Sequence, residues 1–294
     1  MAMGAPFTPT ARADTTTIIP PKFELLANPG DTISEKLRIL NPGPNNGTYS
    51  TDIQDFTASG DEGGVNFVED PKAPRTSFSL ASWMTVEPSS FTIPAGGEKT
   101  VNIVIVTPKS AEAGTHTASI QVKLDPTGQT TGGGAIVESK LNSLILLRVS
   151  GNIQTKMEIT SFRTDQSYYQ NGPVDFILTS KNEGNVHFAP KGTIEITNTF
   201  GKKVKELALK SANVLPNSSR AVRTTWDSTG MVGRYSATLV ASYGDQNTPI
   251  TANTTFIVMP LGLAGIAVAI VILIILALLN AKRIRKFLHN LTSD

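Results

Sequence analysis

Short runs in which apolar and polar residues alternate fill most of positions 14 to 257, and clusters of Gly, Pro and Asn separate them. Alternation of this kind predicts half-buried β-strands, because successive side chains of a strand point to opposite faces. In the run 36–40, Leu37 and Ile39 point to one face while Lys36 and Arg38 point to the other. Strands are expected in the first half at 23–26, 36–40, 48–56, 91–93, 100–106, 118–124 and 144–149.

The second half of this region repeats the same style. Its candidate strands lie at 156–162, 174–180, 192–198, 204–209, 220–226, 235–243 and 251–258. Seven short strands separated by turn residues are the number that an immunoglobulin-like sandwich uses. Because 14–257 shows little helical periodicity, we expect an all-β fold of two tandem immunoglobulin-like β-sandwiches.

Two segments, 93–122 and 215–240, show their features in the same order. Each has an apolar residue and a proline, a small polar turn, a strand, and then Gly-x-His/Tyr-x-Ala. His116 and Tyr235 occupy equivalent places, where a tyrosine of a sandwich typically bonds to nearby backbone, so both are predicted to be structural. This internal repeat, which we call the echo, favours two related sandwiches. The predicted domains are 14–150 and 151–255.

A run of 24 residues, 256–279, carries no charged or hydrogen-bonding side chain. At about 1.5 Å per residue, a helix of this length spans roughly 36 Å, which exceeds a hydrocarbon core of about 30 Å. A soluble helix of this length shows a polar face, and this run shows none. We therefore expect a single transmembrane α-helix over 256–279. Its membrane-anchor residues are Phe256, Leu261, Ile266, Ile270, Leu273, Leu276 and Leu279.

Basic residues flank only one side of this apolar run. The flank consists of Lys282, Arg283, Arg285 and Lys286. The nearest basic residue before the run is Arg234. Since positive residues remain in the cytoplasm, the tail 280–294 is expected to be cytoplasmic and the sandwiches extracytoplasmic. The expected localisation is the plasma membrane, with a single pass.

The N-terminal residues 1–13 end in Ala11-Arg12-Ala13, the A-x-A form of a signal-peptidase site. They lack the basic region and the apolar core of a signal peptide. We interpret 1–13 as the remnant of an export signal or as a disordered leader.

Composition excludes several classes of function. The absence of cysteine rules out a disulfide scaffold, a thiolate metal site and a cysteine nucleophile. The histidines, His116, His187 and His289, lie far apart in the sequence and form no visible zinc motif. A formal net charge of +2 gives no reason to expect a nucleic acid as partner.

The remaining chemical signals are weak. Acidic residues flank a Gly-rich loop without the regular spacing of a calcium loop. They are Asp61, Glu62, Glu69 and Asp70. Within the segment 182–187, Asn182 to Asn185 is interpreted as a turn between strands and His187 as a partly exposed strand residue. The loop 128–134 lacks the Lys-Ser/Thr of a phosphate-binding loop. No catalytic signature appears, so we expect no enzyme activity, no cofactor and no metal.

Several motifs follow one another in a distinctive order. A Phe-x-Leu…Pro-Gly entry leads to a strand that ends in Asn, and Val-x-Pro then leads to Ile-Pro-Ala and Thr-Val. The matching residues are Phe23, Pro29, Gly30, Asn41, Val86, Pro88, Ile93, Pro94, Ala95, Thr100 and Val101. This order resembles the N-terminal domain of the WxL-interacting cell-surface proteins of Gram-positive-type bacteria. Segments 214–220 and 233–239 are similar to that family's second sandwich.

The resemblance implies two immunoglobulin-like domains followed by a C-terminal membrane anchor. In the family, the first domain is associated with peptidoglycan binding and the second with protein partners, including secreted WxL proteins. The chain has no W-x-L motif, so it would be the anchor side of such a pair. No ligand-binding residue can be carried over.

The expected function is that of a membrane-anchored extracellular binding protein, attached to cell wall polymer or to another surface protein through its immunoglobulin-like domains. Its expected partners are the lipid bilayer and peptidoglycan or a WxL-type surface protein. Two alternatives remain open, namely a structural or assembly subunit of a larger membrane or cell-surface complex, and an accessory module of an envelope enzyme.

Overall fold

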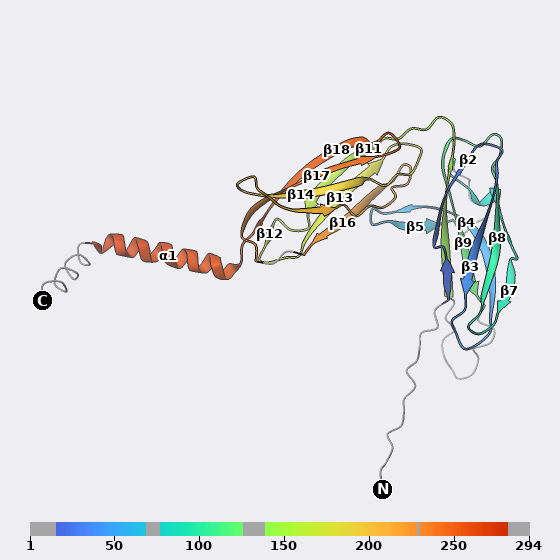
Figure 1. Ribbon diagram of the computed structural model, residues 1–294, viewed down its shortest axis with the longest axis horizontal. Helices are drawn as coiled ribbons and strands as arrows, with labels where there is room; N and C mark the ends of the chain where they lie inside the picture. Colours follow the sequence, from blue (N-terminus) through green and yellow to red (C-terminus); the bar gives the residue numbers. More distant parts are fainter. Residues whose placement is uncertain (1–15, 69–76, 126–138, 228–229, 282–294) are drawn as a thin grey trace, which may run out of the picture. The chain divides into compact units, whose positions relative to one another are not determined.

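The computed structural model describes residues 16–68, 77–125, 139–227 and 230–281 (Figure 1). The chain divides into two compact units. Unit 1 is Met1–Lys156 with Asn182–His187 and Val214–Ser219, and unit 2 is Met157–Lys181, Phe188–Asn213 and Arg220–Asp294. Strands paired into two sheets build each unit, so the fold is all-β with two β-sandwich units.

The strands of unit 1 form two sheets. They are β1 (Thr17–Ile19), β2 (Lys22–Ala27), β3 (Thr32–Leu40), β4 (Gly47–Ser59), β5 (Gly64–Phe67), β6 (Met84–Glu87), β7 (Ser90–Ile93), β8 (Glu98–Val106), β9 (Gly114–Leu124) and β10 (Ser139–Val149). One sheet has the order β1-β3-β8-β6. The other has the order β2-β10-β9-β4-β5, with β7 also paired to β4. The β2–β10 pair is parallel, and the β3–β8 and β9–β10 pairs are antiparallel.

Alternate residues of these strands fill a single core. Leu37 and Ile39 are fully buried, whereas Lys36 and Arg38 on the same strand are exposed. This is the arrangement that the alternating sequence predicted, and it follows from the pleat of the strand. Removing the apolar side from water supplies the main stabilisation of such a sandwich. Other members of the core are Phe23, Tyr49, Ile103, Ile120, Ile145 and Leu147.

Unit 2 also has two sheets. Its strands are β11 (Met157–Thr164), β12 (Tyr168–Tyr169), β13 (Val174–Asn182), β14 (Lys191–Asn198), β15 (Lys203–Ala208), β16 (Ser219–Trp226), β17 (Gly233–Tyr243) and β18 (Thr248–Val258). The smaller sheet has the order β11-β13-β16, and the larger has the order β12-β18-β17-β14-β15. The seven strands predicted for this half are all present, and β12 is an addition.

Aromatic rings dominate the core of unit 2. Phe256 is 1% exposed, and its ring centroid lies 5.6 Å from that of Tyr235, 5.7 Å from that of Phe176 and 6.3 Å from that of Trp226. Such ring pairs add specific geometry to the burial of a large apolar area. Phe256 is therefore a core residue at the end of β18.

The apolar run 256–279 is divided between two elements. Its first three residues end β18, and the helix α1 (Leu261–Leu279) contains 19 residues, about 28 Å at 1.5 Å per residue. Across the described residues, no helix combines the length and hydropathy that crossing a membrane requires. This finding corrects the predicted transmembrane helix over 256–279, and with it the predicted single-pass, plasma-membrane localisation.

The echo between the two halves of the sequence has a structural counterpart. Tyr235 donates a hydrogen bond from its hydroxyl to the carbonyl of Val232, 3.2 Å away. The Nε2 atom of His116 lies 3.0 Å from the carbonyl oxygen of Glu112. Both side chains thus bond to backbone three or four residues upstream, which confirms the structural role predicted for them.

Candidate functional site

Strand β2 is the terminal strand of its sheet, and β10 is its neighbour. The amide of Leu144 donates to the carbonyl of Pro21, and the amide of Ser150 donates to the carbonyl of Ala27, at 3.0 and 2.9 Å. Because main-chain groups of a strand point alternately to its two sides, Phe23 and every second residue after it point toward β10. The main-chain N–H and C=O of Leu26 therefore point away from the sheet.

The side chains of β2 alternate between the core and the outer face, and one of the outer side chains, that of Leu26, is apolar. Phe23 and Ala27 face the core, and Lys22 and Glu24 form an ion pair on the outer face, joined by a short contact. Leu26 shares the outer face and is 75% exposed, more than any other large apolar strand side chain among the described residues. The main-chain groups that an edge strand turns away from its sheet form a template for pairing with another chain.

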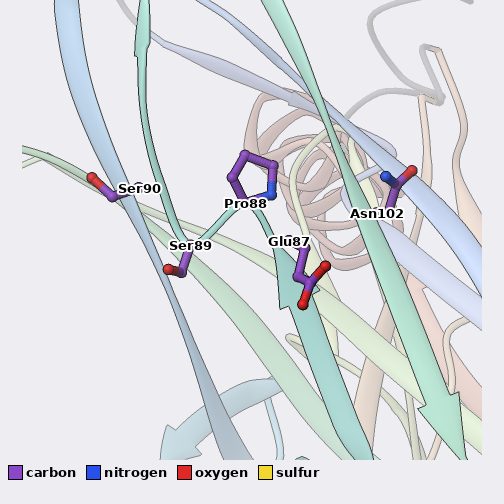
Figure 2. A pocket seen from close by; sticks show the side chains of 5 residues that line it. All are labelled: Glu87, Pro88, Ser89, Ser90 and Asn102. Atoms are coloured by element: carbon purple, nitrogen blue, oxygen red, sulfur yellow. The ribbon is translucent and has the colours of Figure 1, made fainter.

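A shallow hollow lies at the β6 edge of the four-stranded sheet β1-β3-β8-β6, where β6 passes to β7. Figure 2 shows its lining, which consists of Glu87, Pro88, Ser89, Ser90 and Asn102 around about 590 Å³. Glu87 and Asn102 are directly opposite each other on β6 and β8. The carboxylate, the amide and the two hydroxyl groups offer hydrogen bonds to a small polar molecule. The lining contains no histidine, lysine or arginine.

Within unit 1, the segment Asn182–His187 is bonded to the start of β9. The amide of Thr115 donates to the carbonyl of Asn185 at 2.8 Å, and Asn185 Nδ2 donates to the carbonyl of Ala113 at 3.0 Å. The Thr115 hydroxyl oxygen accepts from the amide of His187 at 2.9 Å and lies 2.8 Å from His187 Nδ1. When Nδ1 is unprotonated, the Thr115 hydroxyl donates its hydrogen to it.

The surroundings of His187 favour its neutral form. Burial is the largest cause that lowers the pKa of His187 below its ordinary value, and the positive charges of Arg148 and Lys22 lower it further. The carboxylate of Glu24 acts in the opposite direction. Neutral His187 therefore matches the hydrogen bond that Thr115 offers.

Two carboxylates in unit 2 have structural partners. Burial, followed by the hydrogen bond to Asp165, raises the pKa of Tyr169 to about 12. Burial by itself raises the pKa of Asp175, but hydrogen bonds from Thr225 and Arg223, both 2.7 Å, lower it overall. These groups tie strands together, and neither pair lines the hollow at Pro88.

The predicted site residues are not brought together into one site. Phe256 lies in the core of unit 2, and Leu261 begins α1. Exposed side chains on α1 belong to Ile266, Ile270, Leu273, Leu276 and Leu279. The basic flank, Lys282, Arg283, Arg285 and Lys286, lies outside the described residues.

The structure describes only part of the predicted acidic loop. Asp61 and Glu62 form the turn between β4 and β5, and Glu69 and Asp70 lie outside the described residues. The Gly-rich loop 128–134 lies outside them as well. In the part of the chain that the structure describes, no three His, Asp or Glu side chains gather as metal ligands.

Sequence reasoning missed Leu26, although the sequence carries a signal for it. In the run 23–26, the alternation of apolar and polar positions fails at Leu26, which is apolar at an outward position. A break in alternation is visible in a sequence, but whether the strand lies at an edge is not.

No protein-family model matches the chain, and no curated protein matches it. Solved structures of similar fold include the class 5 fimbriae chaperone CfaA, with 14% identity and a TM-score of 0.43 over 83% of this chain and 99% of that one. Another is the CupB2 chaperone of Pseudomonas aeruginosa, with 12% identity and a TM-score of 0.37 over 81% of this chain and 98% of that one. A third is a structure of Salmonella enterica SafA pilin in complex with the SafB chaperone, with 12% identity and a TM-score of 0.40 over 85% and 99% of the two chains.

These findings correct the predicted membership of the WxL-interacting family. No family model supports it, and the solved structures of similar fold include fimbrial and periplasmic chaperones. The predicted role as a membrane-anchored wall-binding protein is corrected for the same reason. The predicted partners, namely the lipid bilayer, peptidoglycan and a WxL-type surface protein, are corrected with it.

Proposed function

We propose that this protein is a non-enzymatic binding protein that holds an extended segment of another polypeptide along the free edge of β2. Binding by strand addition uses main-chain hydrogen bonds for affinity and alternate side chains for specificity. The edge position of β2, with Leu26 exposed on it, is the observation that carries the proposal.

The main chain of β2 supplies the first part of such a contact. The N–H and C=O of Leu26 point away from β10, so they can pair with a strand added at the edge. The six residues of β2 match the usual length of a strand in a globular protein. The sheet of unit 1 would then continue by one strand.

The side chains of β2 define the chemistry of the bound segment. Leu26 offers an apolar contact, and the Lys22–Glu24 ion pair lies two to four residues away on the same face. The segment that fits best has an apolar residue beside Leu26 and polar or charged residues beside the ion pair.

One of the structures of similar fold holds a pilin in complex with a chaperone. We propose an assembly role of this kind, in which the chain binds one extended segment of the polypeptide that it helps to assemble. We also assign both sandwiches to the immunoglobulin-like type, because two mainly antiparallel sheets with seven or more strands build each unit.

The experiment measures binding of a synthetic peptide of alternating threonine and valine to the full chain by titration calorimetry. A peptide of the same composition, with the valines in one block, is the matched control. The alternating peptide is expected to bind and to shift the amide resonances of β2. Equal binding of the two peptides would contradict strand addition.

Two variants locate the contact. Leu26→Pro removes an N–H that points away from the sheet, a place where an edge strand tolerates proline, and is expected to weaken peptide binding by about tenfold or more. Leu26→Lys is compared with Val240→Lys, which alters an exposed apolar side chain on the inner strand β17. Binding that survives both Leu26 variants would refute the β2 site, provided that their thermal unfolding matches that of the wild type.

A further inference from the structure

The chain contains two Asn-Gly steps, and the structure holds them in different ways. They are Asn46-Gly47, at the start of β4, and Asn171-Gly172, between β12 and β13. In such a step, the amide nitrogen of the glycine can reach the side-chain carbonyl carbon of the asparagine, because no Cβ hinders its approach. Each step is therefore a candidate for spontaneous deamidation, and the local structure decides which one reacts.

The first step, Asn46-Gly47, is restrained on both sides. The Asn46 Oδ1 atom accepts a hydrogen bond from the amide of Ala95 at 3.1 Å. Gly47 begins β4 and is paired with β7. The amide of Thr51 donates to the carbonyl of Ser89 at 2.8 Å, and the alternation of main-chain groups along β4 turns the amide of Gly47 to the same side. Attack by the Gly47 nitrogen therefore requires this end of the strand to open.

The second step, Asn171-Gly172, lacks such restraints. Asn171 is exposed in the four-residue connection between Tyr169 and Val174. In the part of the chain that the structure describes, neither the carboxamide of Asn171 nor the amide of Gly172 has a hydrogen-bond partner. The ends of the connection are fixed, since the amide of Met259 donates to the carbonyl of Tyr169 at 2.8 Å and Val174 is buried. Approach of the Gly172 nitrogen to Asn171 thus breaks no hydrogen bond of the described fold.

We propose that Asn171 is a site of spontaneous deamidation in the folded chain, whereas Asn46 is protected. The amide of Gly172 loses its proton to a base in solution, and its nitrogen forms a bond to Cγ of Asn171. The Cγ–Nδ2 bond breaks, and Nδ2 takes up a proton and leaves as ammonia, so a cyclic succinimide remains. Water then opens the ring at either carbonyl and leaves aspartate or isoaspartate. The net reaction consumes one water and releases one ammonia, and no atom is oxidised or reduced.

The reaction changes this connection of unit 2 in two ways. A carboxylate replaces a neutral carboxamide at position 171, which lowers the formal net charge of the chain from +2 to +1. In isoaspartate the main chain runs through the former side chain, so the connection between β12 and β13 becomes one methylene longer. The site does not involve β2, and its test is independent of the strand-addition proposal.

The experiment follows both asparagines in the same sample. The full chain is incubated at mildly alkaline pH and digested with trypsin, and mass spectrometry measures the conversion of each asparagine. The tryptic peptide 164–181 contains Asn171 and no other asparagine. In the folded chain, Asn171 is expected to react about tenfold or more faster than Asn46, because Asn46 reacts only when its strand opens. In urea the two rates are expected to agree within about threefold. Equal rates in the folded chain, or no reaction at Asn171, overturn the proposal.

A variant tests the attacking atom. Gly172→Ala places a Cβ beside the nitrogen, and it is expected to slow the reaction at Asn171 about tenfold. Gly172 is not among the glycines with a left-handed φ, so alanine can adopt its backbone conformation. Gly262→Ala, where an added Cβ meets nothing within 4 Å, is the matched control and is expected to leave both rates unchanged.

The products provide a second measurement. Isoaspartate forms through the succinimide and not by direct hydrolysis of the carboxamide, so it is expected among the products at position 171. Labelling of the digested peptide by an isoaspartyl methyltransferase detects it. A rate at Asn171 that is the same in the wild type and in Gly172→Ala, or the absence of isoaspartate, overturns the proposed attack by Gly172.

Discussion

Asn41 and Asn182 make matching hydrogen bonds at the ends of two strands, β3 and β13. The Nδ2 atom of Asn41 donates to the carbonyl of Asn45 at 2.8 Å and to the carbonyl of Ile93 at 3.1 Å. Its Oδ1 atom accepts from the amide of Gly43 at 3.2 Å. One amide side chain thereby closes the loop that follows β3 against the end of β7.

Asn182 repeats this arrangement. Its Nδ2 atom donates to the carbonyl of Val186 at 2.8 Å and to the carbonyl of Val214 at 2.9 Å, and its Oδ1 atom accepts from the amide of Gly184 at 2.9 Å. Val214 lies two residues before Pro216 of the second echo segment, and Ile93 lies directly before Pro94 of the first. The internal repeat of this chain therefore extends to buried polar groups.

Replacing either asparagine with alanine is expected to lower the free energy of unfolding by about 2–3 kcal/mol, because buried carbonyls lose their donor. Asn253, exposed on β18, is the control, and Asn253→Ala is expected to change stability by no more than about 0.5 kcal/mol. Urea denaturation of the full chain measures all three. A loss below about 0.5 kcal/mol for both buried variants would show that these bonds are replaced by others.

Phe256 provides a test of where β18 ends. Phe256→Ala removes a ring from the core of unit 2, and it is expected to destabilise that unit by about 3–5 kcal/mol. Ile270→Ala changes an exposed side chain of α1 and is expected to leave the unfolding midpoint of the unit unchanged. Thermal unfolding followed by near-ultraviolet circular dichroism compares the two. Equal, small effects would show that Phe256 is not part of the sandwich core.

The histidine at position 187 predicts a dependence of stability on pH. Since the pKa of His187 is lowered in the folded state, the unfolded chain takes up a proton at a higher pH than the folded chain. The stabilisation is present above the ordinary histidine pKa of about 6.5, and it is lost as the pH falls through the lower folded value. The free energy of unfolding is therefore expected to decrease from pH 7.5 toward about pH 5.

Replacing His187 with glutamine removes the titration while keeping a side chain that can accept the Thr115 hydroxyl. The slope of unfolding free energy against pH is expected to be smaller in this variant. Urea denaturation at several pH values measures the slope. An unchanged slope would place the pH dependence on another group.

Much of the fold was predictable from local pattern. The alternating pattern predicts that Leu37 and Ile39 are buried together, whatever the position of their strand in the sheet. The reason is that the pleat of a strand turns every second side chain to the same face. The short strands β1, β5, β6 and β12 were missed, because runs of two to four residues are too short for alternation to stand out. Phe256–Val258 fitted both a strand and an apolar helix, and packing among aromatic rings decided for the strand.

The candidate binding surfaces were less predictable. Leu26 is one apolar residue among many in the sequence, and its exposure follows from β2 being paired on one side only. Strand order cannot be predicted from a local pattern.

The sequence by itself determined the all-β class, the positions of most strands and the faces that they bury, because side-chain alternation is a property of a single strand. Only the tertiary structure decided three further features. Strand β2 lies at the edge of its sheet, Asn41 and Asn182 make matching hydrogen bonds to distant carbonyls, and Phe256 packs in the core of unit 2. These features depend on which strands lie side by side, and that choice is made by contacts between residues far apart in the chain.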